Sequence, residues 1–306
     1  MQYALTMETL LFLLGRLKLK ELHRDIQEVL DACAKASMTP LEVLAYALGT
    51  EVEGRELRRV EIGMKIAHFP RVCTLEGFDF TCQPGVSEGK IRELANLDWV
   101  SARSNVLFQG PPGVGKTHLA IALGRRAVEA GYSVSFVSAA VLMRQLEEAD
   151  AAGRTEFRIA QYMKPKLVII DEFGYLPVRP STANLFFHLV AARYETGSIL
   201  LTTNRPAGEW GMILGDLTVA TAILDRYLHH CDVVTIRGES YRLREARRNG
   251  VLGRGAAQLQ EARQSGRSGF PGGIPAIRKQ APKSRESLEE GVSDDPAGLN
   301  TEAPRN

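Results

Sequence analysis

The sequence predicts an α/β domain built on a parallel sheet, preceded by a small helical domain. Between residues 105 and 236, short apolar runs alternate with amphipathic stretches, a pattern typical of βαβ units. Within residues 1–72, apolar positions recur at helical spacing and β-branched residues are scarce. After residue 249 the chain is rich in Gly, Pro, Ser and charge. We therefore expect a helical domain over 1–72, an α/β domain over 73–248 and a disordered tail over 249–306.

Composition places the chain among globular proteins without membrane partners. Its 306 residues are 44% hydrophobic, which is enough for a core. The net charge of +2 does not by itself indicate a nucleic-acid partner. A basic surface that binds nucleic acid would have to come from local clustering of charge. The four cysteines (Cys33, Cys73, Cys82 and Cys231) lack CxxC spacing, and the apolar run 10–14 is too short to span a bilayer. We expect reduced thiols in a cytoplasmic protein.

Residues that start and stop helices mark the predicted helical domain. Thr39 stands before Pro40, which suits an N-cap followed by proline at the first helical position. Pro70 pushes the preceding Phe69 out of the α region, so the last helix of this domain should close there.

Five apolar runs have the length of buried strands. They are Val106–Gln109, Val134–Ser138, Leu167–Asp171, Ile199–Thr203 and Val233–Ile236. Ligands of parallel α/β sheets bind beyond the carboxyl ends of the strands. Functional residues are therefore expected just after these runs.

A phosphate-binding loop follows the first predicted strand. Residues 110–117 read GPPGVGKT and match GxxxxGK[ST] between a strand and a helix, the context that this motif requires. The backbone N–H groups would cradle phosphates, Lys116 would neutralise their charge, and the Thr117 hydroxyl would ligate Mg²⁺. The predicted ATP-binding residues are Gly110, Pro111, Pro112, Gly113, Val114, Gly115, Lys116 and Thr117.

Two acids follow the third predicted strand. Asp171 ends the run and would share Mg²⁺ with Thr117, and Glu172 could polarise a water for attack on the γ-phosphate. A carboxylate in that position favours hydrolysis over transfer to an acceptor hydroxyl. An acidic pair alone is more often a turn or a cap, but the upstream loop favours the catalytic interpretation.

Three further residues are weaker candidates. Asn204 ends the fourth strand and could hydrogen-bond the attacking water or the γ-phosphate, although asparagine there is often only a turn former. Arg226 could reach a neighbouring subunit's γ-phosphate as an arginine finger, and Arg242 could contact nucleotide phosphates. Periodicity alone does not separate either arginine from a solvated helix face.

The combined motifs resemble the IstB-like ATP-binding proteins of insertion sequences, relatives of the DnaC and DnaI helicase loaders. The likeness covers about residues 8–248. It is carried by FP at 69–70, LEGFDF at 75–80, THLAIALG at 117–124, DEFGYLP at 171–177, TNRP at 203–206, EWG at 209–211, AILDR at 222–226 and GESYR at 238–242. Phe173 replaces the usual leucine of the family, which is a tolerable apolar exchange.

The resemblance implies further properties, which do not follow from the spacing of the motifs alone. It implies an AAA+ P-loop NTPase with a five-stranded parallel sheet in the order 5-1-4-3-2. It also implies ATP-dependent homo-oligomers on double-stranded DNA and delivery of a partner transposase to target sites. By the same resemblance, His118 lies at the nucleotide, Arg226 in the arginine-finger region and Arg242 at the second sensor.

One stretch of local charge suggests DNA contact. Arg55, Arg58, Arg59 and Lys65 could line one helical face and neutralise phosphates. The alternative is a solvated face balanced by the acids at 51, 53, 56 and 61. The resemblance favours DNA.

The leading hypothesis is therefore an ATPase that binds DNA and assists a transposase. Two alternatives stay open: a replicative helicase loader, which would differ in its partner, and an ATP-gated scaffold without hydrolysis, for which Glu172 would be dispensable.

Overall fold

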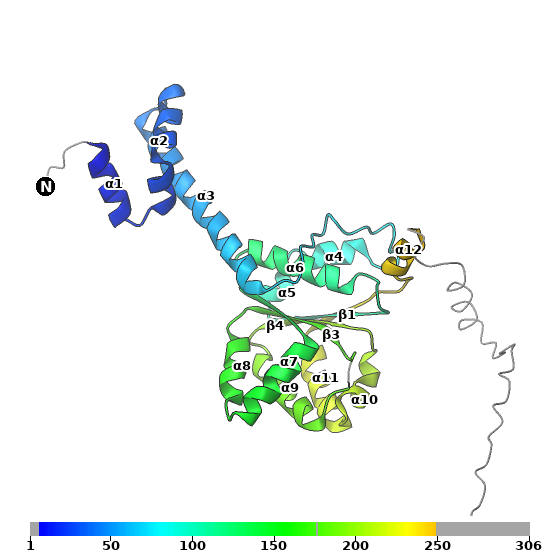
Figure 1. Ribbon diagram of the computed structural model, residues 1–306. Helices are drawn as coiled ribbons and strands as arrows, with labels where there is room; N and C mark the ends of the chain where they lie inside the picture. Colours follow the sequence, from blue (N-terminus) through cyan, green and yellow to red (C-terminus); the bar gives the residue numbers. More distant parts are fainter. Residues whose placement is uncertain (1–5, 176, 249–306) are drawn as a thin grey trace, which may run out of the picture. The chain divides into compact units, whose positions relative to one another are not determined.

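The computed structural model describes residues 6–175 and 177–248 (Figure 1). Its helices are α1 (Met7–Arg16), α2 (Lys20–Lys35), α3 (Pro40–Ala67), α4 (Glu88–Leu94), α5 (Asp98–Ser101), α6 (Lys116–Glu129), α7 (Ala139–Ala151), α8 (Thr155–Met163), α9 (Pro180–Arg193), α10 (Trp210–Leu214), α11 (Leu217–His229) and α12 (Tyr241–Arg248), with a 3₁₀ turn at Ala207–Glu209. The tail predicted over 249–306 lies outside the described residues.

The sheet has the predicted number, direction and order of strands. Its strands are β1 (Asn105–Gln109), β2 (Val134–Ser138), β3 (Leu167–Phe173), β4 (Ser198–Thr203) and β5 (Cys231–Thr235). All pairs are parallel and the order is β2-β3-β4-β1-β5, which confirms the expected 5-1-4-3-2. The last strand begins two residues earlier than predicted because Cys231 pairs with Asn105 of β1.

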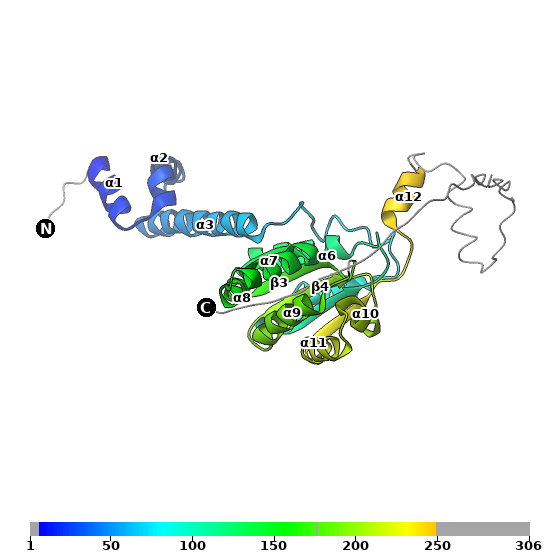
Figure 2. The ribbon, with the colours of Figure 1, turned by 60° about the horizontal axis from the view of Figure 1, so that its bottom comes forward.

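Helices cover both faces of the sheet, with α6 on one side and α7, α9 and α11 on the other (Figures 1 and 2). Successive residues of a strand point to opposite faces, so β3 contributes to two cores. Leu167 and Ile169 pack with the α6 layer, whereas Val168 and Ile170 pack with the α7 and α9 layer. Burial on both faces explains why β3 reads as a continuous apolar run.

The N-terminal helices α1–α3 have a core of their own. It consists of Leu14, Leu22, Ile26, Val29 and Cys33. The predicted cap of α3 is confirmed, because Thr39 and Glu42 form a capping box ahead of Pro40. The helix ends at Ala67, with His68 in the left-handed region, two residues before the predicted stop. Among the described residues, no helix combines the length and apolarity that crossing a bilayer requires.

An irregularity in the pairing of β3 with β4 shapes the carboxyl edge of the sheet. Ile170 pairs with Leu201 and Phe173 with Thr203, so two residues of β3 oppose Thr202 alone. Such a bulge re-aims the side chains that it carries. The two residues in the bulge are Asp171 and Glu172, the acids singled out in the sequence.

Candidate functional site

The loop between β1 and α6 depends on glycines at two positions. Gly113 and Gly115 have φ angles of +81° and +101°, which side-chain-bearing residues rarely adopt. A Cβ on Gly113 would lie 2.1 Å from Oγ of Ser240, and one on Gly115 would lie 2.5 Å from Cε2 of Phe78. The loop is therefore packed between the start of α12 and the segment before α4. Its backbone wraps around the N-terminus of α6, as a phosphate cradle requires.

Lys116 lies at the bottom of this cradle. The residue is 6% exposed, and its ammonium donates to the carbonyl oxygens of Gly110 and Pro111, both at 2.8 Å. Burial lowers the pKa of Lys116 to about 8, with Asp171 opposing this shift and Arg242 adding to it. Most of the ammonium is protonated at neutral pH. An anionic ligand that replaces the two carbonyls would gain a poorly solvated positive charge.

Thr117 and Asp171 meet as the sequence predicted. The Thr117 hydroxyl donates to Oδ1 of Asp171 at 2.9 Å, across the gap between α6 and β3. A hydroxyl and a carboxylate oxygen are ligands that Mg²⁺ accepts in sites where phosphates complete the coordination. The donor set therefore fits Mg²⁺.

Glu172 stands beside Asp171 in the bulge. Its φ of +60° is unusual for a residue with a side chain, and backbone strain of this kind clusters at functional sites. Glu172 is exposed and lines the same cleft as Lys116 and Thr117. The strained bulge thus presents a solvent-accessible carboxylate next to the predicted phosphate and metal ligands.

Thr202 of β4 holds both acids in place, and sequence reasoning missed it. Its hydroxyl donates to Oδ1 of Asp171 at 2.6 Å and accepts the backbone N–H of Glu172 at 3.0 Å. The second bond gives a partner to a backbone N–H inside the bulge, where the regular pairing of β3 with β4 is interrupted. The only sequence signal was a polar residue inside an apolar strand, and which residue of β3 it faces depends on a register that the sequence does not reveal.

Replacing Thr202 by Val should lower the rate of any reaction that uses these acids, with little change in ligand affinity. The isosteric side chain removes the two bonds at the bulge, and bonds to charged groups contribute about 1.5–3 kcal/mol. We expect roughly a 10-fold lower kcat for ATP hydrolysis. The measurement is steady-state phosphate release. Thr202→Ser keeps the hydroxyl and should restore the rate; equal rates in the Val and Ser variants would remove this role.

The remaining walls of the cleft come from both ends of the α/β domain. Phe78 and Gln83 approach from the segment before α4, and Tyr241 and Arg242 from α12. His118 also lines the cleft, and its Nε2 lies 2.8 Å from the carbonyl oxygen of Thr74. The structure thus places the predicted residues His118 and Arg242 at the same cleft as the phosphate loop.

The other two candidates are not among the residues that line this cleft. Asn204 follows β4, but it is not among the lining residues, and its buried Oδ1 has no hydrogen-bond partner within the described chain. Arg226 lies on α11 with its guanidinium 4.9 Å from the centre of the Phe187 ring. The Arg226 side chain therefore does not reach the cleft of its own chain, so a finger role would require a second copy.

The four predicted DNA contacts do not form one free basic face. Arg55 pairs with Glu51 at 2.6 Å, Arg58 pairs with Glu21, and Lys65 pairs with Glu61 at 2.6 Å. Arg59 instead points to the end of α6, where its guanidinium donates to the carbonyl oxygen of Glu129 at 3.5 Å. Each of the four cations has a partner within the chain. Their role in DNA binding stays a prediction.

Comparison with known proteins gives a consistent result. The family model described as IstB-like ATP binding protein matches residues 12–249. A putative ATP-binding protein of insertion sequence IS21 from Pseudomonas aeruginosa is 45% identical over 255 residues, covering 83% of this chain and 96% of the relative. The corresponding protein of IS5376 from Geobacillus stearothermophilus is 45% identical over 206 residues, covering 67% and 82%.

Solved structures show more distant likeness. The structure titled DnaI matches with a TM-score of 0.47 and 18% identity, covering 57% of this chain and 94% of that one. The replication initiator DnaA bound to AMPPCP and single-stranded DNA matches with a TM-score of 0.46 and 22% identity, covering 64% and 60%.

Proposed function

Because the chain belongs to the family of IstB-like ATP-binding proteins, we propose that it is a Mg²⁺-dependent ATPase that binds double-stranded DNA and assists a transposase. The observation that carries the proposal is the cleft lined by Lys116, Thr117 and Glu172, with Asp171 hydrogen-bonded to Thr117 beside it. The relatives are named as insertion-sequence ATP-binding proteins. We assign this chain to the same setting.

ATP fits the cleft by charge and by backbone geometry. The positive φ angles of the loop glycines would let backbone N–H groups turn toward phosphate oxygens, and Lys116 offers a buried ammonium. Thr117 and Asp171 would hold Mg²⁺, which would neutralise charge on the phosphates. Arg242 adds a second cation from α12.

Hydrolysis is assigned to Glu172. Its exposed carboxylate would accept a proton from water while Thr202 holds the backbone of the bulge. We also assign catalytic roles to Asn204 and Arg226. The Asn204 side chain would have to rotate toward the cleft, and Arg226 would act on the cleft of a neighbouring subunit. Self-association would place Arg226 of one subunit near the cleft of the next, as an arginine finger requires.

The first test is ATP binding and hydrolysis by the wild type and by Lys116→Ala. Loss of one charge-assisted partner of the phosphates, at about 1.5–3 kcal/mol, should weaken ATP binding roughly 10- to 100-fold. Calorimetry measures the affinity, and phosphate release measures turnover. Lys166→Ala is the matched control, because this exposed lysine lies before β3 and outside the cleft.

Three results would contradict the proposed function or favour an alternative to it. Unchanged ATP affinity in Lys116→Ala would remove the phosphate-loop assignment. Tight ATP binding by the wild type without phosphate release, with and without duplex DNA, would favour the ATP-gated scaffold. Affinity capture with the transposase of the same element as one bait and a replicative helicase as the other separates the transposition role from helicase loading.

A further inference from the structure

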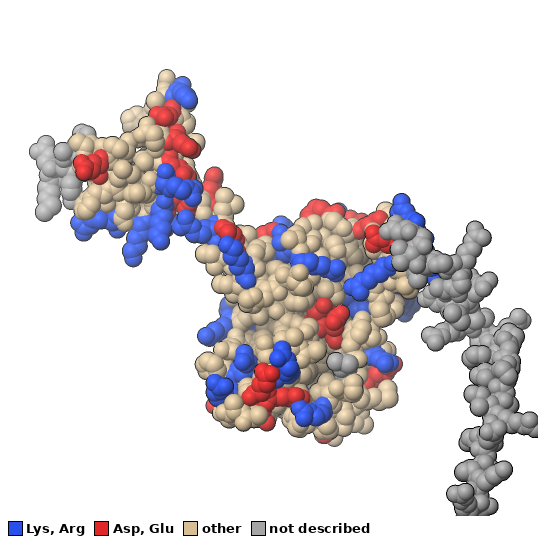
Figure 3. Space-filling view, viewed as in Figure 1, with Lys and Arg blue, Asp and Glu red and all other residues tan. Residues whose placement is uncertain are grey.

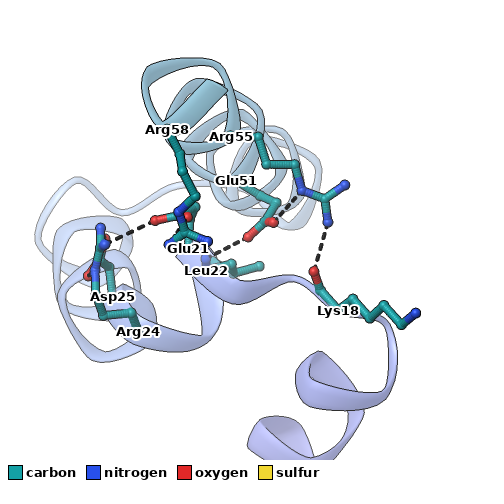
Figure 4. Close-up of polar contacts among 8 residues, drawn as sticks. All are labelled: Lys18, Glu21, Leu22, Arg24, Asp25, Glu51, Arg55 and Arg58. Carbon is teal, nitrogen blue, oxygen red and sulfur yellow. Dashed lines mark hydrogen bonds and ion pairs between the residues drawn. The ribbon is translucent and has the colours of Figure 1, made fainter. Parts of the chain in front are cut away.

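Two buried carboxylates join α2 to α3 in the N-terminal helices. The side chains of Glu21 and Glu51 are each 4% exposed and point into the space between the helices (Figure 4). Glu51 accepts the backbone N–H of Leu22 at 2.8 Å and Nε of Arg55 at 2.6 Å. Burial opposes the ionised form of Glu51, but these two donors outweigh it and lower its pKa. An internal carboxylate therefore already occupies the N-terminus of α2.

The arginines that neutralise these acids extend to the surface. Glu21 pairs with Arg24 at 3.0 Å and also with Arg58. The side chains of Arg55 and Arg58 are 54% and 44% exposed, although the carboxylates that they bind are inside. The negative charge of the network is thus internal, and its positive charge faces solvent. Ion pairs of this kind hold a guanidinium at a fixed place on the surface.

The turn between α1 and α2 adds lysines to this positive surface. Nη2 of Arg55 donates to the carbonyl oxygen of Lys18 at 2.9 Å, which holds the turn against α3. The Lys18 ammonium points away from the network (Figure 4). Arg16 and Lys20, on either side in the sequence, are exposed as well. Within the part of the chain that the structure describes, none of these three forms an ion pair with a carboxylate.

We propose that Arg16, Lys18, Lys20 and Arg55 form a surface, the turn surface, that binds the phosphate backbone of duplex DNA. Figure 3 shows Lys and Arg gathered along one side of helices α1–α3. The inference rests on the DNA binding proposed above and places it at a specific surface. It differs from the face predicted from sequence, because Arg59 and Lys65 are engaged elsewhere.

Charge and its accessibility support this choice of occupant. Exposed lysines are compact, strongly hydrated charges that suit phosphate oxygens, and cations without partners lose no ion pair when they bind. The buried acids hold Arg55 in position in advance, which reduces the entropy lost on binding. Contacts to phosphates carry no sequence information, so the turn surface should bind duplexes of any sequence.

The test uses Lys18→Glu combined with Lys20→Glu in the full chain. Arg55 is an unsuitable target, because its removal would leave the buried carboxylate of Glu51 without its ion-pair partner. The matched control combines Lys35→Glu with Lys164→Glu, two exposed lysines outside the turn surface that give the same change in net charge. Circular dichroism and melting temperature verify the fold of both proteins.

Fluorescence anisotropy would measure binding to a labelled duplex at several salt concentrations, with an ATP analogue that is not hydrolysed. The slope of log K against log salt concentration should become shallower by about 0.9 for each lost phosphate contact. For the double variant we therefore expect a slope that is shallower by about 2. We expect its affinity to fall roughly 10-fold or more at physiological ionic strength, whereas the control should resemble the wild type.

Four results would overturn the proposal. Wild-type affinity and slope in the Lys18/Lys20 variant would leave DNA binding intact but move it away from the turn surface. If the Lys18/Lys20 variant and the control lose the same affinity for duplex, net charge and not the turn surface determines DNA binding. A Lys18/Lys20 dependence seen with phosphatidylserine vesicles, but not with duplex, would replace DNA by a membrane surface. A wild type that binds no duplex would remove the DNA-binding part of the proposed function together with the surface.

Discussion

Glu172→Gln should bind ATP with nearly wild-type affinity and hydrolyse it about 10²- to 10⁴-fold more slowly, the usual contribution of a general base. The amide keeps the size of the side chain but does not accept the proton of the attacking water. Lys116 and Thr117, which line the cleft, and Asp171, which is hydrogen-bonded to Thr117, remain unchanged, so the ligands for Mg·ATP are kept. Single-turnover phosphate release would measure the rate, and calorimetry the affinity.

The same variant should change DNA binding in the opposite direction. If the ATP-bound state is the one that assembles on DNA, a protein that keeps its ATP should remain on DNA longer than the wild type. Dissociation from labelled duplex after dilution measures this lifetime. Glu148→Gln, an exposed acid on α7 paired with Arg144, is the control and should match the wild type in both assays. A normal hydrolysis rate in Glu172→Gln would take this carboxylate out of the mechanism.

The residues of the phosphate loop and its partners were predictable because their chemistry is local. The loop, β3 and the acids each stand in a short segment whose pattern fixes the element, and parallel strands bring their ends to one edge. Sequence also predicted the N-cap of α3 at Thr39, and the structure adds the capping box that Thr39 forms with Glu42. What could not be predicted was the bulge in β3, because a register shift depends on the partner strand and leaves no mark on β3 itself.

Charges on α3 were misleading for a related reason. Glu51 looked like one of several acids on a solvated face, but α2 packs over it and buries it. Arg59 looked like a neighbour of Arg55 and Arg58, yet its guanidinium turns to the end of α6, 70 residues later in the chain. Whether a charge on a helix is free depends on which helix covers it, and helical spacing contains no information about the covering element.

Arg193 illustrates how a charged residue can be structural. It ends α9, is 1% exposed, and binds backbone carbonyls from three separate segments. Nη1 donates to the carbonyl oxygens of Tyr162 and Pro165 at 2.5 and 3.1 Å, and Nη2 to those of Lys166 and Ser198 at 3.0 and 2.8 Å. Burial lowers the pKa of Arg193 to about 10, so the guanidinium stays charged at neutral pH. One side chain thus ties the end of α8 to the starts of β3 and β4.

Arg193→Met should destabilise the fold more than any substitution at the cleft. Methionine fills a similar volume but donates no hydrogen bond, so four carbonyls that had a donor lose it. A buried carbonyl left without its donor costs about 1–3 kcal/mol, and the sum over these carbonyls corresponds to a fall in melting temperature of roughly 10 °C or more for a domain of this size. Thermal denaturation followed by circular dichroism measures the shift. Arg103→Met is the matched control, since this exposed arginine donates to a single carbonyl, that of Glu195, at 3.1 Å. If both variants melt within a degree or two of the wild type, water replaces the guanidinium at these carbonyls, and the connection between α8, β3 and β4 does not depend on Arg193.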